Sequence, residues 1–178
     1  EAAGSKILRP FQDGSLPAPY RGLVALDGNL TLELLSEMAR SPLLAKADLR
    51  VAPASPGKAL RLSPFLQAGR GTLYVNLEEA GLLCQSHFDG SADAARALVA
   101  RGAVRAVVTD GGNPASLGDA RGVITQDPPA VHVTRVTGAG DTFMAAHIAA
   151  EHQGLDPDAT LAQALAAAAQ YVSGETKI

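Results

Sequence analysis

Short apolar runs alternate with helical patterns along most of this chain, and that alternation restricts the folds available to it. Four runs have the length and composition of buried strands, at residues 23–26, 49–52, 72–75 and 104–109. Helical patterns lie at about residues 31–40, 56–66, 92–101, 139–153 and 159–173, and a further helix begins at Asn76. Strands that alternate with helices form a mainly parallel sheet with helices on both faces, so we predict an α/β fold.

The segment at residues 113–134 interrupts this alternation. It carries weak strand patterns at residues 115–117, 122–125 and 131–134, which predict a small antiparallel stretch. Two residues mark expected helix boundaries. Pro64 should break the helical segment 56–66 into two pieces, and Gly102 should end the helix at 92–101.

The composition suits one folded domain or a large part of one, because the 178 residues are 47% hydrophobic and 19% charged. A net charge of −3 and an aromatic content of 4% argue against a nucleic-acid-binding surface. No apolar run reaches the ~18 residues needed to span a bilayer, so we expect no membrane partner. Cys84 is the single cysteine, which favours a reducing, cytoplasmic location.

Polar clusters follow the predicted strands, where the carboxyl ends of parallel strands share one edge of the sheet. The clusters are Asp27-Gly28-Asn29, Asn76-Leu77-Glu78-Glu79 and Asp110-Gly111-Gly112. A fourth polar cluster, Gly138-Ala139-Gly140-Asp141, opens the helix at 139–153. Ligands of open α/β sheets bind at this edge, so we expect the four clusters to converge on one site.

The glycine-rich turn at residues 138–141 has the chemistry of an anion site. The first N–H groups of a helix lack intrahelical partners, and glycines let an anion approach them closely. Gly138, Ala139 and Gly140 therefore suit a transferred phosphoryl group, and Asp141 suits the base that deprotonates an attacking hydroxyl. The alternative is that Asp141 only complements the positive end of a helix. No Gly-Lys-Ser or Gly-Lys-Thr occurs, which excludes a P-loop.

Three ordered motifs resemble those of the ribokinase-like (PfkB) carbohydrate kinases. They are Thr137-Gly138-Ala139-Gly140-Asp141-Thr142-Phe143, Asn76-Leu77-Glu78-Glu79 and Thr109-Asp110-Gly111. The resemblance spans about residues 22–175. It implies a three-layer ribokinase-like fold, with a mainly parallel sheet flanked by helices, and ATP and Mg²⁺ as the phosphoryl donor and the metal.

The resemblance also implies a role for each matching residue. Asp141 would be the catalytic base, and the amides of Gly138, Ala139 and Gly140 would form the anion hole. Asn76 and Glu79 would organise Mg²⁺ and its waters around the phosphates. Thr109 and Gly111 would line the nucleotide site together with Asn76. The alternatives are an ordinary helix N-cap for Asn76 and a solvated helix residue for Glu79.

Two short segments resemble the pseudouridine kinase branch of this family: Leu26-Asp27-Gly28-Asn29-Leu30 and Ser55-Pro56-Gly57-Lys58-Ala59. That resemblance makes Asp27 and Asn29 candidate substrate contacts. The alternative is plain turn chemistry, because Asp, Gly and Asn are common turn residues.

Two departures from the family pattern affect these expectations. Arg135 occupies a position where many members carry an acidic residue, and a guanidinium cannot coordinate a monovalent cation. The family's N-terminal Gly-Gly signature and small β-sheet lid have no counterpart here. We therefore expect residues 1–178 to be the C-terminal part of a single kinase domain, with the N-terminal part and lid absent, and little activity without them.

The sequence thus predicts ATP-dependent phosphoryl transfer to a hydroxyl of a sugar or nucleoside, with pseudouridine as the narrower candidate. A kinase for another sugar and a non-catalytic nucleotide-binding protein of the same fold are the alternatives. A small-molecule substrate would be the partner. The resemblance adds a homodimer, because the lid often mediates dimers in this family.

Overall fold

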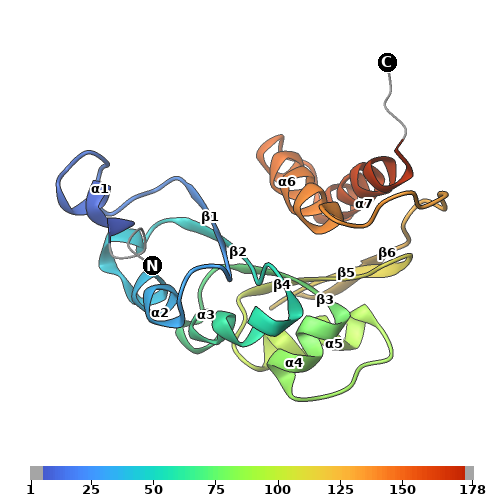
Figure 1. Ribbon diagram of the computed structural model, residues 1–178, viewed down its shortest axis with the longest axis horizontal. Coiled ribbons are helices and arrows are strands. Elements are labelled where there is room, and N and C mark those ends of the chain that lie inside the picture. Colours follow the sequence, from blue (N-terminus) through green and yellow to red (C-terminus); the bar gives the residue numbers. More distant parts are fainter. Residues whose placement is uncertain (1–5, 175–178) are drawn as a thin grey trace.

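A six-stranded sheet runs through the centre of the molecule in the computed structural model, which describes residues 6–174 (Figure 1). The strand order is β1-β2-β3-β4-β5-β6, the same as the order in the chain. The strands are β1 Leu23–Asp27, β2 Asp48–Ala52, β3 Thr72–Asn76, β4 Arg105–Asp110, β5 Asn113–Asp119 and β6 Gly122–Gln126. The first four are parallel, and β5 and β6 continue the sheet in antiparallel fashion. The predicted α/β fold and antiparallel stretch are therefore confirmed.

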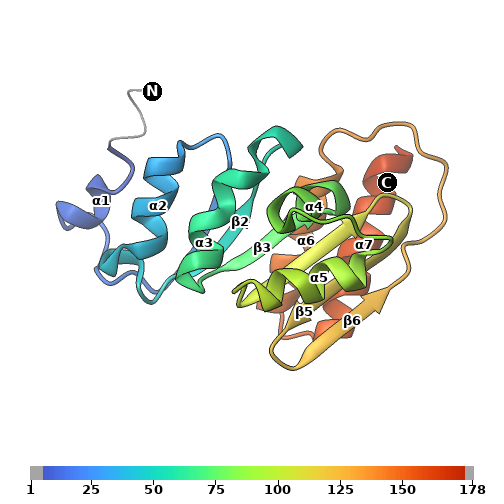
Figure 2. The ribbon, with the colours of Figure 1, turned by 90° about the horizontal axis from the view of Figure 1, so that it is seen from below.

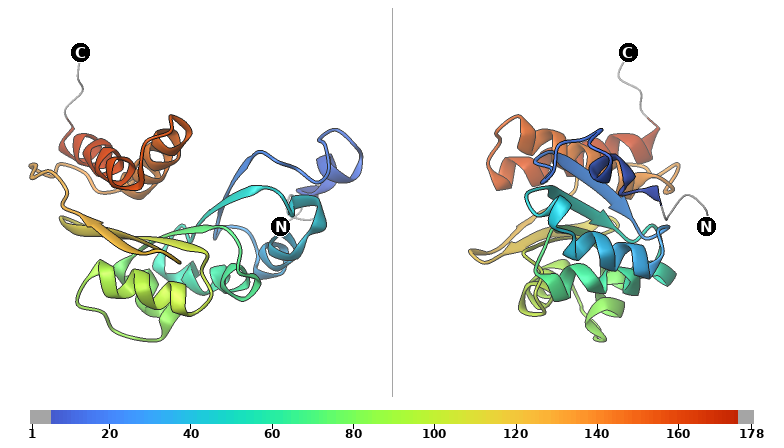
Figure 3. Two further views of the ribbon diagram at one scale, coloured as in Figure 1. Left: turned by 180° about the vertical axis from the view of Figure 1, so that it is seen from behind. Right: turned by 90° about the vertical axis from the view of Figure 1, so that its left-hand side faces the viewer.

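Helices cover the sheet on both faces. The helical elements are α1 Arg9–Gln12, α2 Leu32–Arg40, η2 Pro42–Leu44, η3 Pro56–Leu62, α3 Ser63–Ala68, α4 Leu77–Cys84, α5 Ser91–Ala100, α6 Ala139–His152 and α7 Pro157–Ser173. Consecutive parallel strands are neighbours in the sheet, and the crossovers that join such strands are right-handed. Helices α2, α3, α4 and α5 therefore lie on one face, as Figure 2 shows. Helices α6 and α7 lie on the opposite face, over the later strands (Figure 3). No helix within residues 6–174 is long and apolar enough to cross a membrane.

The core has two parts because successive strand residues point to opposite faces of the sheet. Leu73 and Val75 join the larger apolar cluster beneath α2 to α5. Tyr74 and Val107 join the smaller cluster, which includes Phe143 of α6 and residues of α7. The two layers of helices are thus fixed independently, and α6 brings the predicted anion turn to the carboxyl edge of β3 and β4.

Local signals explain most helix boundaries. The Thr31 hydroxyl accepts a hydrogen bond from the N–H of Leu34, and Asp156 accepts one from the N–H of Ala159, so each side chain caps a helix. The break predicted at Pro64 occurs one residue earlier, between η3 and α3. Pro64 lies in the first turn of α3, where a missing N–H is tolerated. Gly102 follows α5 with a φ of 111°, as the predicted end requires.

One expectation about secondary structure was wrong. The strand expected at residues 131–134 does not form; this segment is exposed coil between β6 and α6 that hydrogen-bonds to the last turn of α7. Alternation alone cannot produce a strand where no neighbouring strand offers a ladder.

Candidate active site

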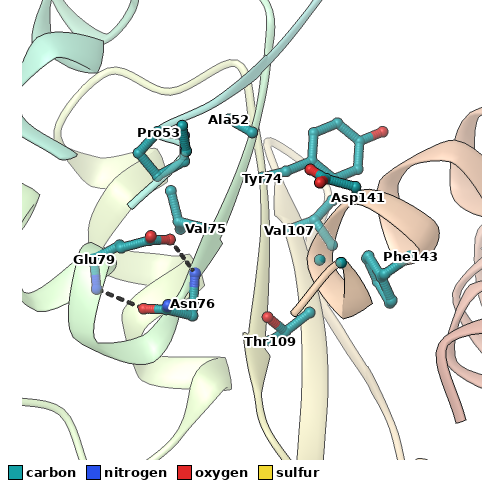
Figure 4. Close-up of a pocket in the computed structure, with 13 residues that line it drawn as sticks. Ala52, Pro53, Tyr74, Val75, Asn76, Glu79, Val107, Thr109, Asp141 and Phe143 are labelled. Atoms are coloured by element: carbon teal, nitrogen blue, oxygen red, sulfur yellow. Dashed lines mark hydrogen bonds between the residues drawn. The ribbon is translucent and has the colours of Figure 1, made fainter. Parts of the chain in front are cut away.

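A cavity of about 210 Å³ opens at the carboxyl edge of the sheet, between the ends of β2 to β4 and the first turn of α6 (Figure 4). Six residues predicted from the sequence line it: Asn76, Glu79, Thr109, Gly138, Gly140 and Asp141. Asn76 and Glu79 lie on one side of the cavity, and Asp141 lies on the other (Figure 4). Two of the four clusters expected to converge therefore meet at the cavity, those at residues 76–79 and 138–141. The cluster at residues 110–112 does not line it, although Thr109 just before it does.

The turn that begins α6 leaves three backbone N–H groups without an acceptor within residues 6–174, those of Gly138, Gly140 and Asp141. Gly138 is left-handed, with a φ of 91°, and its carbonyl oxygen accepts from the N–H of Thr142 at 2.9 Å. The N–H of Ala139 donates to the carbonyl of Val136 at 3.0 Å, so it is not free for a ligand. Within residues 6–174, nothing accepts from the N–H groups of Gly140 and Asp141. These two amides, next to each other at a helix N-terminus, can receive an anion.

Asp141 lies in the first turn of α6 and is exposed. Its carboxylate has no hydrogen-bond or ion-pair partner among the described residues. It does not cap its helix in the way that Asp156 caps α7, where a carboxylate oxygen accepts from Ala159 at 2.8 Å. A carboxylate without a structural partner, next to an anion site, can accept a proton from a bound hydroxyl.

Asn76 and Glu79 form a reciprocal capping box at the start of α4. The N–H of Glu79 donates to the Asn76 Oδ1 at 2.8 Å, and the N–H of Asn76 donates to the Glu79 Oε2 at 2.8 Å. Glu79 is only 7% exposed. Burial raises the pKa of its carboxyl, the Asn76 N–H opposes that shift, and the nearby charge of Glu78 adds to it. The N-cap alternative for Asn76 is therefore realised, but Glu79 is a buried residue facing a cavity and not a solvated one.

The capping box is compatible with magnesium. Mg²⁺ keeps several waters and is usually held by one or two carboxylates together with substrate phosphates. Residues 6–174 contain no group of three or more Asp, Glu, His or Cys side chains that could hold a metal alone. The second oxygen of Glu79 and the amide of Asn76 fit a metal that is bound chiefly through phosphates and water.

The β4 end contributes Thr109 but not Gly111. Thr109 pairs with Asn76 in the register of β3 and β4, which places both at the cavity. Gly111 lies beyond it in the exposed turn to β5, with a φ of 57°, and does not line the cavity. The backbone of this turn requires a glycine-like conformation, which is a structural reason for the residue.

Asp27 and Asn29 lie beside the cavity and not in its lining. The Asp27 carboxylate accepts from the Asn29 N–H at 2.8 Å and from its Nδ2 at 3.0 Å, and Lys58 Nζ donates to the Asn29 Oδ1 at 2.5 Å. Gly28 packs so closely on the Pro53 carbonyl that a β-carbon would collide with it, and Pro53 does line the cavity. The turn chemistry expected as an alternative is present, directly behind one cavity wall.

Arg135 is held by Tyr171 of α7. Its guanidinium lies 3.9 Å from the centre of the Tyr171 ring, and its Nε donates to the Tyr171 carbonyl at 2.7 Å. The Tyr171 hydroxyl donates to the carbonyl of Thr137 at 3.0 Å, next to Gly138. We call Arg135 and Tyr171 the clasp. The sequence analysis did not find it, because Tyr171 lies 34 residues after Thr137 and no local motif links the two.

Sequence analysis also missed the apolar walls of the cavity, Tyr74, Val107 and Phe143. A signal was available for one of them. Tyr74 stands two residues before Asn76 in a strand, and alternate strand residues share a face. Ala54, which also lines the cavity, has a φ of 67° that no feature of the sequence indicates.

Comparison with known proteins identifies the class. The model of the pfkB family of carbohydrate kinases matches residues 23–176. Because this match covers most of its length, the chain belongs to the pfkB carbohydrate kinase family. Among curated proteins, none matches the sequence.

Solved structures share the fold. A carbohydrate kinase from Agrobacterium tumefaciens has 26% identity and a TM-score of 0.73, over 92% of this chain and 51% of that one. A phosphofructokinase-2 mutant from Escherichia coli has 20% identity and a TM-score of 0.79, over 97% of this chain and 57% of that one. Ribokinase from Thermotoga maritima has 21% identity and a TM-score of 0.72, over 85% and 50%. This chain therefore spans about half the length of these proteins.

Proposed function

We propose that this chain supplies the phosphate-binding and proton-accepting parts of an ATP-dependent kinase, whose acceptor is a hydroxyl of a sugar or nucleoside. One observation carries the proposal. The Asp141 carboxylate, which has no partner among residues 6–174, lies across one cavity from the Asn76–Glu79 box (Figure 4). Gly140 and Asp141, whose N–H groups have no acceptor within residues 6–174, line the same cavity. Membership of a carbohydrate kinase family supports it.

The residues of the chain divide the work of phosphoryl transfer. Asp141 accepts the proton of the acceptor hydroxyl as its oxygen attacks the γ-phosphorus, the bond from phosphorus to the bridging oxygen breaks, and ADP leaves. The Gly140 and Asp141 amides, with the dipole of α6, stabilise the negative charge on the transferred group. Asn76 and Glu79 would hold the metal and its waters. When bound, Mg²⁺ neutralises phosphate charge during the transfer. Positioning provides most of the acceleration.

A narrower acceptor, pseudouridine, has weaker support. Its basis is the Asp27–Asn29–Lys58 chain of hydrogen bonds, which lies behind the Pro53 wall and presents polar groups near the cavity. A kinase for another sugar uses the same phosphate side equally well. The non-catalytic alternative is disfavoured, because a binding module gains nothing from a carboxylate without a structural partner. A cytoplasmic location, a homodimer and a C-terminal place in a longer kinase stay predictions.

The decisive experiment measures ADP release by the full-length protein with pseudouridine, uridine, ribose and fructose as acceptors, in the parent sequence and in Asp141→Asn. Loss of the general base should lower turnover by about 10²–10⁴-fold, while ATP binding changes little. Asp93→Asn is the matched control, because Asp93 also lies in the first turn of a helix but far from the cavity and is paired with Arg96. If Asp141→Asn retained more than a small part of the activity, the assigned base would be wrong. Equal rates with all four acceptors would remove the pseudouridine assignment only.

A further inference from the structure

Helix α6 is attached to the sheet by buried polar side chains, and not mainly by close backbone packing. Its backbone packs most extensively against α7, its neighbour in the same layer (Figures 1 and 3). Between α6 and the parallel strands lie five side chains, which we call the α6 network: Arg50 of β2, Tyr74 of β3, Arg105 of β4, and His147 and Glu151 of α6.

The α6 network joins three adjacent strands to one helix. Arg50 donates from NH1 to the Tyr74 hydroxyl at 3.0 Å and also to the Glu151 carboxylate. The Tyr74 oxygen lies 3.0 Å from the Nδ1 of His147. Arg105 donates to the other carboxylate oxygen of Glu151. Glu151 thus receives arginines from β2 and β4, while Tyr74 from the strand between them reaches α6 one turn earlier.

The donors and acceptors of the α6 network allow one assignment of the protons on Tyr74 and His147. Because Arg50 can only donate, the Tyr74 hydroxyl accepts from it and donates its own hydrogen to His147 Nδ1. His147 is then neutral, with its proton on Nε2, which is buried without a partner within residues 6–174. Burial opposes ionisation of Glu151, but Arg105 and Arg50 outweigh it and hold the pKa of its carboxyl below the ordinary value.

Further charges near the network complete the balance. Asp48 makes two hydrogen bonds to the Arg50 guanidinium, at 2.8 and 2.7 Å. Two arginines therefore face two carboxylates. Arg50 is buried, Arg105 and Glu151 are partly buried, and Asp48 is about half exposed. Pairs that are taken out of water add little net stability, because desolvation offsets the attraction, but they exclude arrangements that leave a charge unpaired. Sliding α6 by one turn, about 5.4 Å, would separate Glu151 from both arginines.

The same elements form the cavity. Arg50, Tyr74 and Arg105 precede Ala52, Asn76 and Thr109 on their strands by two, two and four residues, and these three residues line the cavity. The helix that carries His147 and Glu151 begins with the anion turn and Asp141. Tyr74 and Phe143 connect the network to the cavity. Both line the cavity, Tyr74 is a member of the network, and the Phe143 ring stacks on His147 with centroids 6.1 Å apart.

We infer that the α6 network is the positioning device of the site. It sets the register of α6 on β2, β3 and β4, and thereby the separation between Asp141 on the helix and Asn76 and Thr109 on the strands. The effect on catalysis rests on the proposed function, whereas the effect on helix position does not. The members are positioning residues, because they act through Asp141 and, except for Tyr74, do not line the cavity.

Helix position can be measured by pulsed electron paramagnetic resonance between two spin labels in the full chain. Exposed residues suited to labelling are Ala149 of α6 and Arg96 of α5, on opposite faces of the sheet. The buried Cys84 is replaced by alanine, so that Ala149→Cys and Arg96→Cys are the two labelled sites. We expect one narrow distance distribution in this parent, and a shifted or broadened distribution after Tyr74→Phe and after Glu151→Gln.

Tyr20→Phe is the matched control for Tyr74→Phe, since its hydroxyl takes part in no hydrogen bond with residues 6–174. Tyr74→Phe removes a single oxygen atom and should fold, which circular dichroism checks. This variant therefore tests the inference even if Glu151→Gln does not fold. Unchanged distance distributions in the folded variants would overturn the inference. The same broadening in Tyr20→Phe would overturn it as well, because the network would then have no specific role.

Turnover separates this inference from the proposed function. A displaced Asp141 should lower kcat about ten-fold or more. Glu151→Gln is the more telling variant, because Glu151 does not line the cavity. Lower turnover with unchanged distances would refute positioning. If the full-length protein phosphorylates no acceptor, the proposed function fails and the distance measurement still decides the inference.

Discussion

Asn76 and Glu79 cap each other across the first turn of α4, each backbone N–H donating at 2.8 Å to the other's side chain. The same two side chains form one side of the cavity (Figure 4). The observed capping role and the proposed metal-binding role therefore fall on the same two residues. Burial of the Glu79 carboxyl has an energetic cost that experiment can measure.

Glu79→Gln should stabilise the fold at neutral pH while lowering ATP turnover. Burial raises the pKa of Glu79 above 4.5, so ionisation is harder in the folded chain than in the unfolded one. Its contribution to stability is full below pH 4.5 and is lost as pH rises through the folded pKa. Glutamine has no such loss and still accepts the Asn76 N–H. Urea unfolding at several pH values should show a gain at pH 7 that vanishes below pH 4.5.

Glu78→Gln is the control for this prediction, because Glu78 is the exposed neighbour on the same helix. It should leave turnover unchanged and raise stability at pH 7 less than Glu79→Gln does, because the charge of Glu78 is the smaller cause of the raised pKa of Glu79. A Glu79→Gln variant that is less stable than the parent at pH 7 would show that the carboxylate is needed to hold the capping box.

The two glycines of the anion turn should respond differently to alanine. At Gly138 a β-carbon would lie 2.5 Å from the Tyr171 hydroxyl, and φ is 91°, so Gly138→Ala should destabilise the fold by about 2 kcal/mol. At Gly140 a β-carbon meets nothing within 4 Å. Gly140→Ala should leave thermal stability unchanged but weaken ATP binding, because the methyl group enters the space of the anion.

Tyr171→Phe should partly restore stability to Gly138→Ala, because it removes the nearest clashing atom. Gly112→Ala is the control, as a β-carbon there also meets nothing within 4 Å and the residue does not line the cavity. Equal losses of stability at Gly138 and Gly140 would contradict the described turn.

Sequence reasoning reached the parts of this site that depend on local patterns. Apolar runs and turn residues located the six strands of the described sheet, and the rule that ligands bind at the carboxyl edge brought Asn76, Glu79 and Asp141 together in advance. Thr109 was added by the family resemblance. Family resemblance assigned their roles, which stay predictions. The strand expected at residues 131–134 failed because pairing depends on a neighbour that the local sequence does not describe.

Contacts between distant segments could not be predicted. The clasp joins residues 36 positions apart, and Arg50 meets Glu151 across 101 positions. From the sequence alone, an arginine in a strand is predicted to be an edge or surface residue, since charged side chains are seldom buried unless paired. Its partners on β3 and α6 become known only when the helix is placed on the sheet. The hydrogen bond of the Ala139 N–H within its own turn likewise could not be predicted, because it depends on the backbone conformation of that turn.

The fold should become less stable between pH 6.5 and pH 4 because of His147. Burial lowers the pKa of His147 from 6.5 to about 4, with Glu151 opposing the shift and Arg105 and Arg50 adding to it. The unfolded chain binds this proton as pH falls through 6.5, whereas the folded chain does not until about 4. Stability is therefore full above pH 6.5 and falls by about 2 kcal/mol at pH 5 from this residue.

His147→Gln isolates that contribution from the titration of carboxylates. Urea unfolding at pH 7 and pH 5 should show a smaller acid loss in His147→Gln than in the parent, by about 2 kcal/mol. His152→Gln is the control, because His152 is exposed at the end of the same helix. Identical pH profiles for His147→Gln and the parent would mean that the buried imidazole is charged in the folded protein.

The clasp should hold the anion turn in the form that binds ATP. Tyr171→Phe removes the hydrogen bond to the Thr137 carbonyl but keeps the ring beneath Arg135. A neutral hydrogen bond contributes about 1 kcal/mol, so ATP affinity should fall about five-fold. Arg135→Lys keeps the charge but loses the Nε donor and the planar stacking, and should weaken ATP binding by a similar factor.

The double variant distinguishes one device from two separate contacts. If Arg135 and Tyr171 act together on the turn, the two losses of ATP affinity will not add. The double variant should then bind ATP about as tightly as whichever single variant has the lower affinity. Tyr20→Phe should bind ATP like the parent. Isothermal titration with ATP provides the affinities, and thermal unfolding provides the stability of α7. If Tyr171→Phe lowered stability without changing ATP affinity, the clasp would fix only the end of α7, and the turn would depend on Gly138 alone.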